Sequence, residues 1–300
     1  MSADVKIGMG LGKVLYAMDF SPSSLAAFPF AASIARHFCG QVLLEHVTDV
    51  SASVPVDSSV LASLDKLLVD AEEDLIISQA SETPHKLLAD HGKVCPTLVS
   101  VADKCDVDLI VIGTHGLRGL RKLIQGSKAE QIMLLSSKPV LIVGPCVTSR
   151  PEFRRILFAT DCSLTAMHAL SCADSLRQVY KSSFILLHVN DSTTEEAPAE
   201  TTPRTLKVLE DAREQGYTEL AQNCETIVEF GPRAERIVEI ARVRQADLIV
   251  LGTHSRSRVK SRIRAHFPGT MAYDVISQAH CPVLTVPFGV GAVKPSLLAS

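Results

Sequence analysis

The sequence predicts an α/β protein built from two doubly wound, five-stranded parallel-sheet domains in tandem. Three observations predict this fold. The chain has 300 residues, which suits two domains of ordinary size. Four motifs recur in the same order about 140 residues further along the chain, which indicates a duplicated domain. Short apolar runs alternate with helical patterns in each half, as in parallel sheets covered on both faces by helices.

The repeated motifs lie mainly in apolar runs of strand length. "VLYAMDFS" (14–21) returns as "ILFATDCS" (156–163), and "VLLEHV" (42–47) returns as "FILLHV" (184–189). "DLIVIGTH" (108–115) returns as "DLIVLGTH" (247–254), and "KPVLIVGP" (138–145) returns as "CPVLTVPF" (281–288). The polar stretch 148–151 separates the two copies, so the predicted domains are residues 1–148 and 149–300.

Each half is predicted to read strand, helix, strand, helix, strand, helix, strand, helix, strand. The first-half strands are "KVLYAM", "QVLLEHV", "HKLLADH", "DLIVIG" and "PVLIVG". Ser21 followed by Pro22 predicts the start of the first helix. Apolar residues share one helical face between Val60 and Leu75, which predicts the second helix. In the second half, the acidic segment 191–203 has the composition of a mobile loop.

Composition narrows the functional classes. A net charge of −3 gives no electrostatic support for nucleic-acid binding. No apolar run approaches the ~20 residues that span a bilayer, and the first residues lack a secretory pattern, so we expect a cytoplasmic protein. The eight cysteines show no C-x-x-C spacing, which argues against zinc and favours small buried hydrophobic side chains; a redox-sensing thiol is the alternative.

The stretch "GTHGLRGLRKLIQGS" (113–127) follows a predicted buried strand and precedes a predicted helix. Ligands of doubly wound sheets bind beyond the carboxyl ends of the strands. Gly116 and Gly126 allow the backbone to approach a ligand closely, and Ser127 opens a helix whose first N–H groups favour an anion. Arg118, Arg121 and Lys122 add positive charge. The stretch is therefore a candidate phosphate site, and a turn that merely joins strand to helix is the alternative.

Asp19 stands where the first predicted strand ends and the first helix begins. A carboxylate there can accept hydrogen bonds from sugar hydroxyls or a base amine. It can equally be a turn residue that accepts bonds from nearby backbone N–H groups. Asp161 takes the same position in the second half.

These motifs together resemble the universal stress proteins, in a tandem arrangement that covers nearly all of residues 12 to 288. The ATP-binding branch carries G-x2-G-x9-G-[ST] after the fourth strand, matched here by Gly113, Gly116, Gly126 and Ser127. The resemblance implies an adenine-nucleotide alpha-hydrolase-like fold that binds ATP. It implies that Gly113 lies by the ribose, that the other three residues hold the phosphates, and that Asp19 faces the nucleotide. Val47 would meet adenine through its backbone, and Mg²⁺ or Mn²⁺ could accompany the triphosphate.

The second half keeps Gly252 but has Ser255 in place of the second glycine, and thirteen residues then precede Gly269 and Thr270. Asp161 and Val189 complete this degenerate or altered site. Its longer loop carries Arg256, Arg258, Lys260, Arg262 and Arg264. These cations could replace backbone amides around phosphate, form a solvated basic strip, or meet an acidic partner or nucleic acid, the last with little support from the rest of the chain.

The resulting hypothesis is an ATP-binding stress-response or signalling protein without catalytic or metal-binding residues. Slow ATP hydrolysis and a nucleotide-free interaction scaffold are the alternatives. The recurring histidines His46 and His188, like His115 and His254, are interpreted as structural. The apolar fifth strands "PVLIV" and "PVLTV" would each form a sheet edge. Exposed apolar edges favour pairing, and the resemblance implies that domains pair through this strand, so the halves are expected to form an internal pseudo-dimer; a homodimer and an unidentified protein partner stay open.

Overall fold

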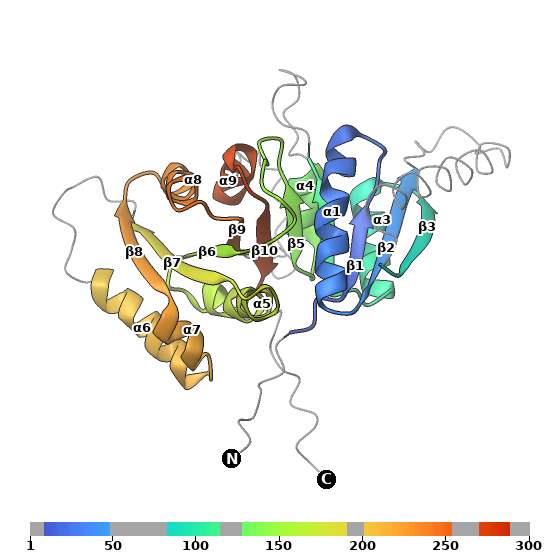
Figure 1. Ribbon diagram of the computed structural model, residues 1–300. Helices are drawn as coiled ribbons and strands as arrows, with labels where there is room; N and C mark the ends of the chain where they lie inside the picture. Colours follow the sequence, from blue (N-terminus) through green and yellow to red (C-terminus); the bar gives the residue numbers. More distant parts are fainter. Residues whose placement is uncertain (1–8, 49–82, 115–127, 191–200, 254–269, 289–300) are drawn as a thin grey trace, which may run out of the picture.

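The first half forms a parallel sheet with helices on both faces. The computed structural model describes residues 9–48, 83–114, 128–190, 201–253 and 270–288. The elements of this half are β1 (Lys13–Ala17), α1 (Pro22–His37), β2 (Gln41–Thr48), β3 (His85–His91), α3 (Val94–Lys104), β4 (Leu109–Gly113), α4 (Lys128–Leu135) and β5 (Val140–Val143) (Figure 1). All five predicted strands are confirmed, whereas the helix predicted between residues 60 and 75 lies outside the described residues.

The second half repeats the strand order of the first, and its connection between the second and third strands contains two helices, α6 and α7. Its elements are β6 (Arg155–Thr160), α5 (Leu164–Tyr180), β7 (Ser183–Asn190), α6 (Thr201–Glu214), α7 (Thr218–Asn223), β8 (Glu225–Phe230), α8 (Arg233–Val243), β9 (Leu248–Thr253), α9 (Met271–Gln278) and β10 (Val283–Pro287). The loop predicted over 191–203 is wrong at its end, because α6 already begins at Thr201. Pro203 falls in the first turn of α6, where proline needs no N–H partner.

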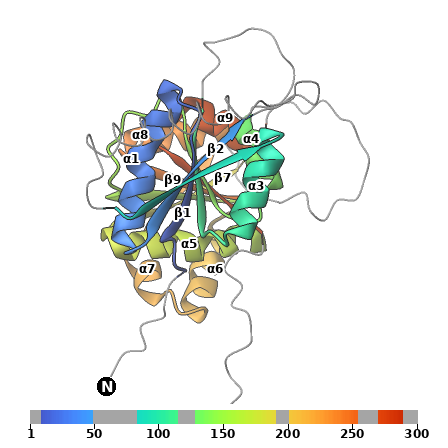
Figure 2. The same cartoon turned by 90° about the vertical axis from the view of Figure 1, so that its right-hand side faces the viewer.

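The strands of both halves join into one sheet in the order β3-β2-β1-β4-β5-β10-β9-β6-β7-β8. Pairing is parallel within each half, as predicted. The halves meet where β5 and β10 pair antiparallel, with Leu141 opposite Leu284. Each fifth strand therefore covers the other's edge, which confirms the internal pseudo-dimer. Viewed from the β3 edge, the strands fan out with the twist expected of such sheets (Figure 2).

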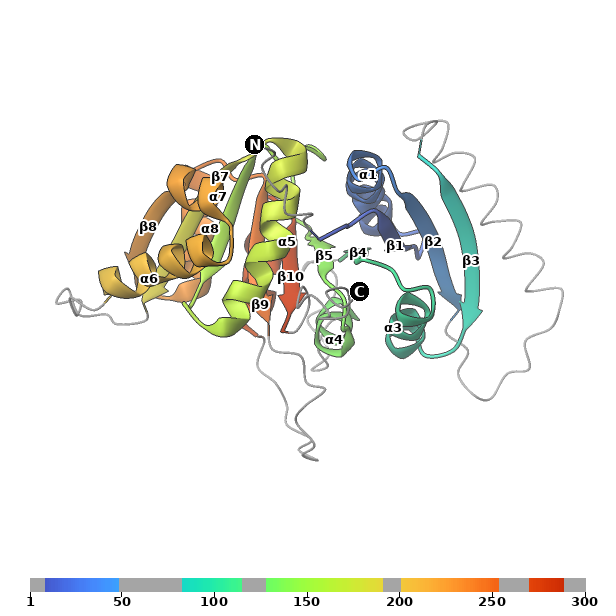
Figure 3. The same cartoon turned by 90° about the horizontal axis from the view of Figure 1, so that it is seen from below.

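One hydrophobic core lies on each face of the sheet, and each core runs through both halves. The first packs α1 and α5 to α7 on the sheet, and the second packs α3, α4, α8 and α9 on the opposite face. Figure 3 shows α1 and α3 on opposite sides of the first-half strands. Residues Val140 to Val143 of β5 are all buried, which explains why the inner strands read as continuous apolar runs.

Aromatic side chains pack around the connection between the halves. Phe153, in this connection, is fully buried and lies against Phe30 of α1 and Tyr180 of α5, at centroid distances of 6.2 and 5.0 Å. The Tyr180 ring also stacks on His37 at 4.0 Å. The Ser33 hydroxyl donates to the Pro151 carbonyl at 2.6 Å. The two halves are thus packed together by buried side chains as well as by the sheet.

Candidate functional site

The strand order of the first half reverses between β1 and β4, which leave the sheet toward helices on opposite faces. A cavity of about 80 Å³, here called the first-domain cavity, lies beyond the carboxyl ends of these strands. Such switch points are where doubly wound sheets bind ligands. The cavity is lined by Ala17, Met18, Asp19, Ser24, Glu45, Val47, Val94, Leu98, Ile112, Gly113, Lys128, Ala129 and Ile132.

Asp19 follows β1 and reaches both the cavity and the start of α1. Its Oδ1 accepts a hydrogen bond from the Ser21 N–H at 3.0 Å, and the Ser21 hydroxyl caps α1 by accepting from the Ser24 N–H at 3.2 Å. Asp161 accepts from the Ser163 N–H at 2.9 Å in the same way. The turn interpretation therefore holds for both aspartates. Asp19 is also exposed at the cavity, so its role in the turn does not remove it from a ligand.

Gly113 ends β4 and lines the cavity. Its close packing against the start of α1 is by itself enough to require a glycine at this position. A Cβ at Gly113 would lie 1.9 Å from the Ser23 carbonyl oxygen and 2.8 Å from the Ser24 Cα. Real Cβ atoms do not approach other atoms so closely, so a side chain would push the start of α1 away from β4. Sequence reasoning attributed this glycine to ligand approach and missed the helix beside it.

Val47 and Lys128 also line the first-domain cavity. Val47 lies near the carboxyl end of β2 and is buried, and Lys128 is the first described residue of α4. The predicted helix after the glycine motif is thus confirmed from Lys128 onward. Three further predicted site residues, Gly116, Gly126 and Ser127, lie outside the described residues.

Glu45 is the cavity residue that sequence reasoning missed. Its side chain is fully buried, and neither carboxyl oxygen has a hydrogen-bond partner among the described residues. Burial, reinforced by the nearby Asp90 carboxylate, raises the pKa of Glu45 to about 8, so this carboxyl is protonated at neutral pH. The available signal was one charged residue in "VLLEHV", where the repeat has Leu187.

The corresponding edge of the second half is arranged differently. Thr270 caps α9, because its hydroxyl accepts from the Tyr273 N–H at 3.3 Å. The Thr270 N–H itself donates to the Glu130 carboxylate of α4, also at 3.3 Å. A carboxylate of the first half therefore meets the N-terminus of α9. Val189 ends up buried near the end of β7 and Gly252 lies in β9, whereas Gly269 is outside the described residues.

The two histidines that recur in the second strand of each half, His46 in β2 and His188 in β7, are held by the main chain. His46 Nδ1 lies 2.8 Å from the Met18 carbonyl oxygen, and His188 Nδ1 lies 2.9 Å from that of Thr160. These bonds fit the structural interpretation of both histidines. In the described residues, no three His, Cys, Asp or Glu side chains form a group that could hold a metal ion. The described helices include none that is long and apolar enough to cross a bilayer.

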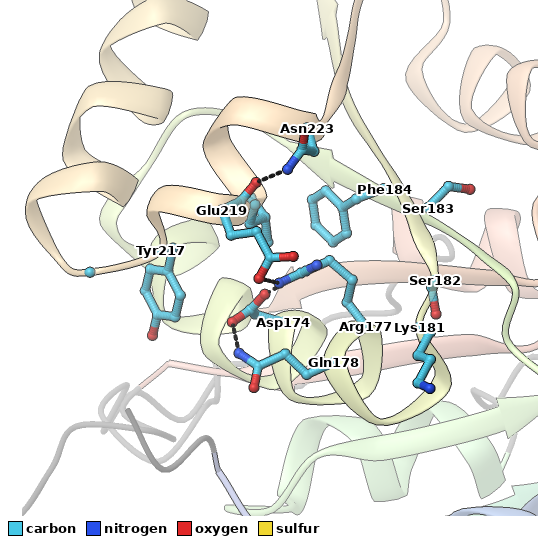
Figure 4. A pocket seen from close by; sticks show the side chains of 12 residues that line it. Asp174, Arg177, Gln178, Lys181, Ser182, Ser183, Phe184, Tyr217, Glu219 and Asn223 are labelled. Atoms are coloured by element: carbon cyan, nitrogen blue, oxygen red, sulfur yellow. Dashed lines mark hydrogen bonds and ion pairs between the residues drawn. The ribbon is translucent and has the colours of Figure 1, made fainter. Parts of the chain in front are cut away.

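A larger cavity, of about 700 Å³, lies at the opposite edge of the second half, beside the start of β7 (Figure 4). Its charged groups mostly bind each other. Asp174 accepts from Arg177 at 2.7 Å and from Gln178 at 2.6 Å, and Arg177 also pairs with Glu219 at 3.5 Å. Ligands of doubly wound sheets bind beyond the carboxyl ends of the strands, whereas this larger cavity lies at the amino ends. Because its charged groups also mostly pair with each other, we interpret this cavity as a structural groove despite its size.

The eight cysteines all have free thiols. Three of them, Cys95, Cys172 and Cys281, are buried as expected. Cys39 and Cys146 are exposed, so the interpretation as buried hydrophobic side chains is wrong for these two. The remaining three are partly buried.

The fold and the site define a duplicated α/β protein with a small cavity at the switch point of its first half. The chain belongs to the universal stress protein family, whose model matches residues 10–144 and 152–287. Universal stress protein Slr1230 of Synechocystis is 26% identical over 91% of this chain and 98% of its own length. Universal stress protein MJ0531 of Methanocaldococcus jannaschii is 33% identical over 44% of this chain and 81% of its own length.

Solved structures share the whole tandem architecture. A universal stress protein from Archaeoglobus fulgidus superposes with a TM-score of 0.68, over 93% of this chain and 99% of its own. The two sequences are only 18% identical, so this likeness supports the fold alone.

Proposed function

We propose that this protein binds ATP at the first-domain cavity and that nucleotide occupancy regulates its interaction with a partner. The observation that carries the proposal is the position of the glycine motif. Gly113, its first residue, and Lys128, which follows its last, both line the cavity. The connection between them contains the rest of G-x2-G-x9-G-S, whose backbone amides suit phosphate.

The described residues divide the work of holding a nucleotide. Val47, Leu98 and Ile112 offer an apolar surface for a base, and Asp19 can accept bonds from ribose hydroxyls. Lys128 supplies a positive charge for phosphate. The cavity of about 80 Å³ is smaller than the ~300–1,000 Å³ of whole ligand sites, so it would receive only part of the nucleotide. The remainder of the ligand would be held by the glycine motif.

The proposal assigns no catalytic residue. The sequence has no P-loop motif, so binding rather than turnover is the function we infer. A divalent cation would have to be held largely by the phosphates, because the described residues contain no metal-ligand group. A homodimer and the identity of the partner stay predictions.

The test is isothermal titration calorimetry of ATP into the full chain, the Gly126→Val variant and the matched Gly269→Val variant. A valine at Gly126 puts a side chain where phosphate should lie, so we expect affinity to fall at least ~100-fold. Gly269→Val makes the same change in the second half and should leave affinity unchanged. Absence of ATP binding to the unaltered chain would contradict the proposal and favour a nucleotide-free scaffold.

A further inference from the structure

Glu45 occupies a position where the sheet itself needs no carboxyl group. It lies in β2 between Ala17 of β1 and Leu88 of β3, on the face shared with Val47. The matching residue of the second half, Leu187, lies between Ala159 and Ile227 in the same register and is fully buried. An apolar side chain therefore satisfies this packing environment, and the glutamate needs another explanation.

The arrangement of Glu45 is energetically unfavourable for the isolated protein. Both carboxyl oxygens are buried and make no hydrogen bond of ordinary length among the described residues, although the Asp90 carboxyl lies close enough to raise the pKa of Glu45. A buried polar group that has left water without gaining a partner destabilises a fold. Such a group is expected where a ligand supplies the missing hydrogen bonds.

The first-domain cavity is the place from which a ligand can supply these bonds, because Glu45 lines it. Around the carboxyl, the lining is largely apolar: Val47, Val94, Leu98, Ile112 and Ile132. These apolar walls beside the Glu45 carboxyl suit a flat heteroaromatic ring better than a phosphate, while the other polar lining residues, Asp19, Ser24 and Lys128, remain for the ribose and phosphates. A cation is a poorer guest, because Glu45 is protonated at neutral pH and the described residues form no metal-ligand group.

We infer that Glu45 reads the base of the nucleotide, pairing its carboxyl O–H and C=O with the ring nitrogen and exocyclic amino group of adenine. A neutral carboxyl carries one donor and one acceptor side by side, which matches the acceptor and donor on that edge of the base. The inference rests on the proposed function, because it names the specificity residue of the same site. It adds that base recognition is confined to the first half. In the second half, Leu187 takes the position of Glu45 and cannot form these hydrogen bonds.

The test is a cycle of two ligands and four proteins, measured by calorimetry at pH 7. The ligands are ATP and purine riboside triphosphate, which lacks the exocyclic amino group. The proteins are the unaltered chain, Glu45→Leu and Glu45→Gln, with Leu187→Met as the matched control in the second half. Thermal melting verifies that each variant folds. Glu45→Leu is expected to fold, because the second half accommodates a leucine, Leu187, in the same register.

We expect the unaltered chain and Leu187→Met to bind ATP about tenfold more tightly than the analogue. Glu45→Leu should lose this preference, and Glu45→Gln should keep most of it, because an amide also offers a donor and an acceptor. If Glu45→Leu keeps the full preference, Glu45 does not contact the base, while the proposed ATP site stands. If the unaltered chain binds neither ligand, both proposals fall.

Discussion

The two halves have the same strand order but differ at one buried position of their second strands. At the same register, the first half buries Glu45 and the second buries Leu187. The apolar residue shows what packing alone requires, since both positions lie between an alanine and an aliphatic side chain. A duplicated chain offers an internal reference: the residue in one half shows what packing requires at the matching position of the other. A carboxyl group at Glu45 therefore needs a reason other than packing.

The helices that follow the fourth strand of each half differ as well. In the second half, two N–H donors at the start of α9 are engaged inside the protein: that of Tyr273 by the Thr270 hydroxyl, and that of Thr270 by the Glu130 carboxylate. Glu130 belongs to α4 of the first half, so one half supplies an anion to the helix of the other. An incoming phosphate at α9 would have to displace a carboxylate. This contact gives a physical reason to expect that the two proposed sites differ, which motif spacing alone did not provide.

The largest expected effect tests whether the halves can be compared as parts of one cooperative unit. Phe153→Ala removes a fully buried ring that contacts Phe30 and Tyr180 across the junction. We expect the free energy of unfolding to fall by about 3–5 kcal/mol in a single transition, measured by urea denaturation. Phe288→Ala, at a 40% exposed ring, is the control and should cost much less. Two separate transitions, only one of which shifts, would contradict a shared core.

The next effect separates packing from ligand binding at Gly113. Gly113→Ala places a Cβ against the backbone of Ser23, so we expect a loss of about 1–3 kcal/mol of stability without any nucleotide present. Chemical denaturation of nucleotide-free protein measures this loss. Gly10→Ala is the control, because nothing lies within 4 Å of the added Cβ. Equal stability of the two variants would return Gly113 to a purely ligand-binding role.

A gain of stability is expected when Glu45 of the first half is replaced by the leucine that the second half has at the matching position. Glu45→Leu removes an unsatisfied buried carboxyl, so we expect about 1–2 kcal/mol of added stability at pH 7. Thermal and urea unfolding of the nucleotide-free protein measure it.

The pH dependence of this gain follows from the raised pKa of Glu45. The carboxyl titrates near pH 4.5 when unfolded and near pH 8 when folded, so the unaltered chain loses stability as pH rises between these values. Asp90 is the charged neighbour that adds to the effect of burial on this pKa, and Asp19 and Lys128 line the same cavity. The advantage of Glu45→Leu should therefore grow from pH 4.5 to 8 and level off above. A constant advantage across that range would show that Glu45 is hydrated in the folded state.

The smallest effect concerns the helix cap of the second half. Thr270→Ala removes the hydroxyl that caps α9, so we expect a loss of about 1 kcal/mol, similar to that of Ser21→Ala at α1. Calorimetric ATP stoichiometry should stay the same in Thr270→Ala. A lower stoichiometry would mean that this hydroxyl binds phosphate rather than only capping the helix.

The sequence predicted the fold because its strongest signals are local. Runs such as "DLIVIG" and "PVLIV" form buried parallel strands, and Ser21 with Pro22 starts α1 as expected. The boundary at Thr201 was missed because acidic and Thr-rich composition outweighed a proline suited to a first turn.

The site was less predictable because its decisive contacts are distant in sequence. The approach of Ser23 to Gly113 and the bond between Glu130 and Thr270 join residues far apart along the chain. Glu45 was visible only as a charge inside an apolar motif, and nothing local indicates that such a carboxyl lacks partners. Asp19 was found because it follows the end of β1, where topology gathers residues, whereas Val47, near the end of β2, was named only through the family resemblance.

Native mass spectrometry of the full chain, titrated with ATP, tests the central claim most directly, because it counts bound nucleotides on each molecule. An unequal pair of sites predicts that one ATP is added at low micromolar concentration and that Gly126→Val, but not Gly269→Val, abolishes this species. A population carrying two ATP molecules, or none, would contradict the assignment of a single competent site to the first half.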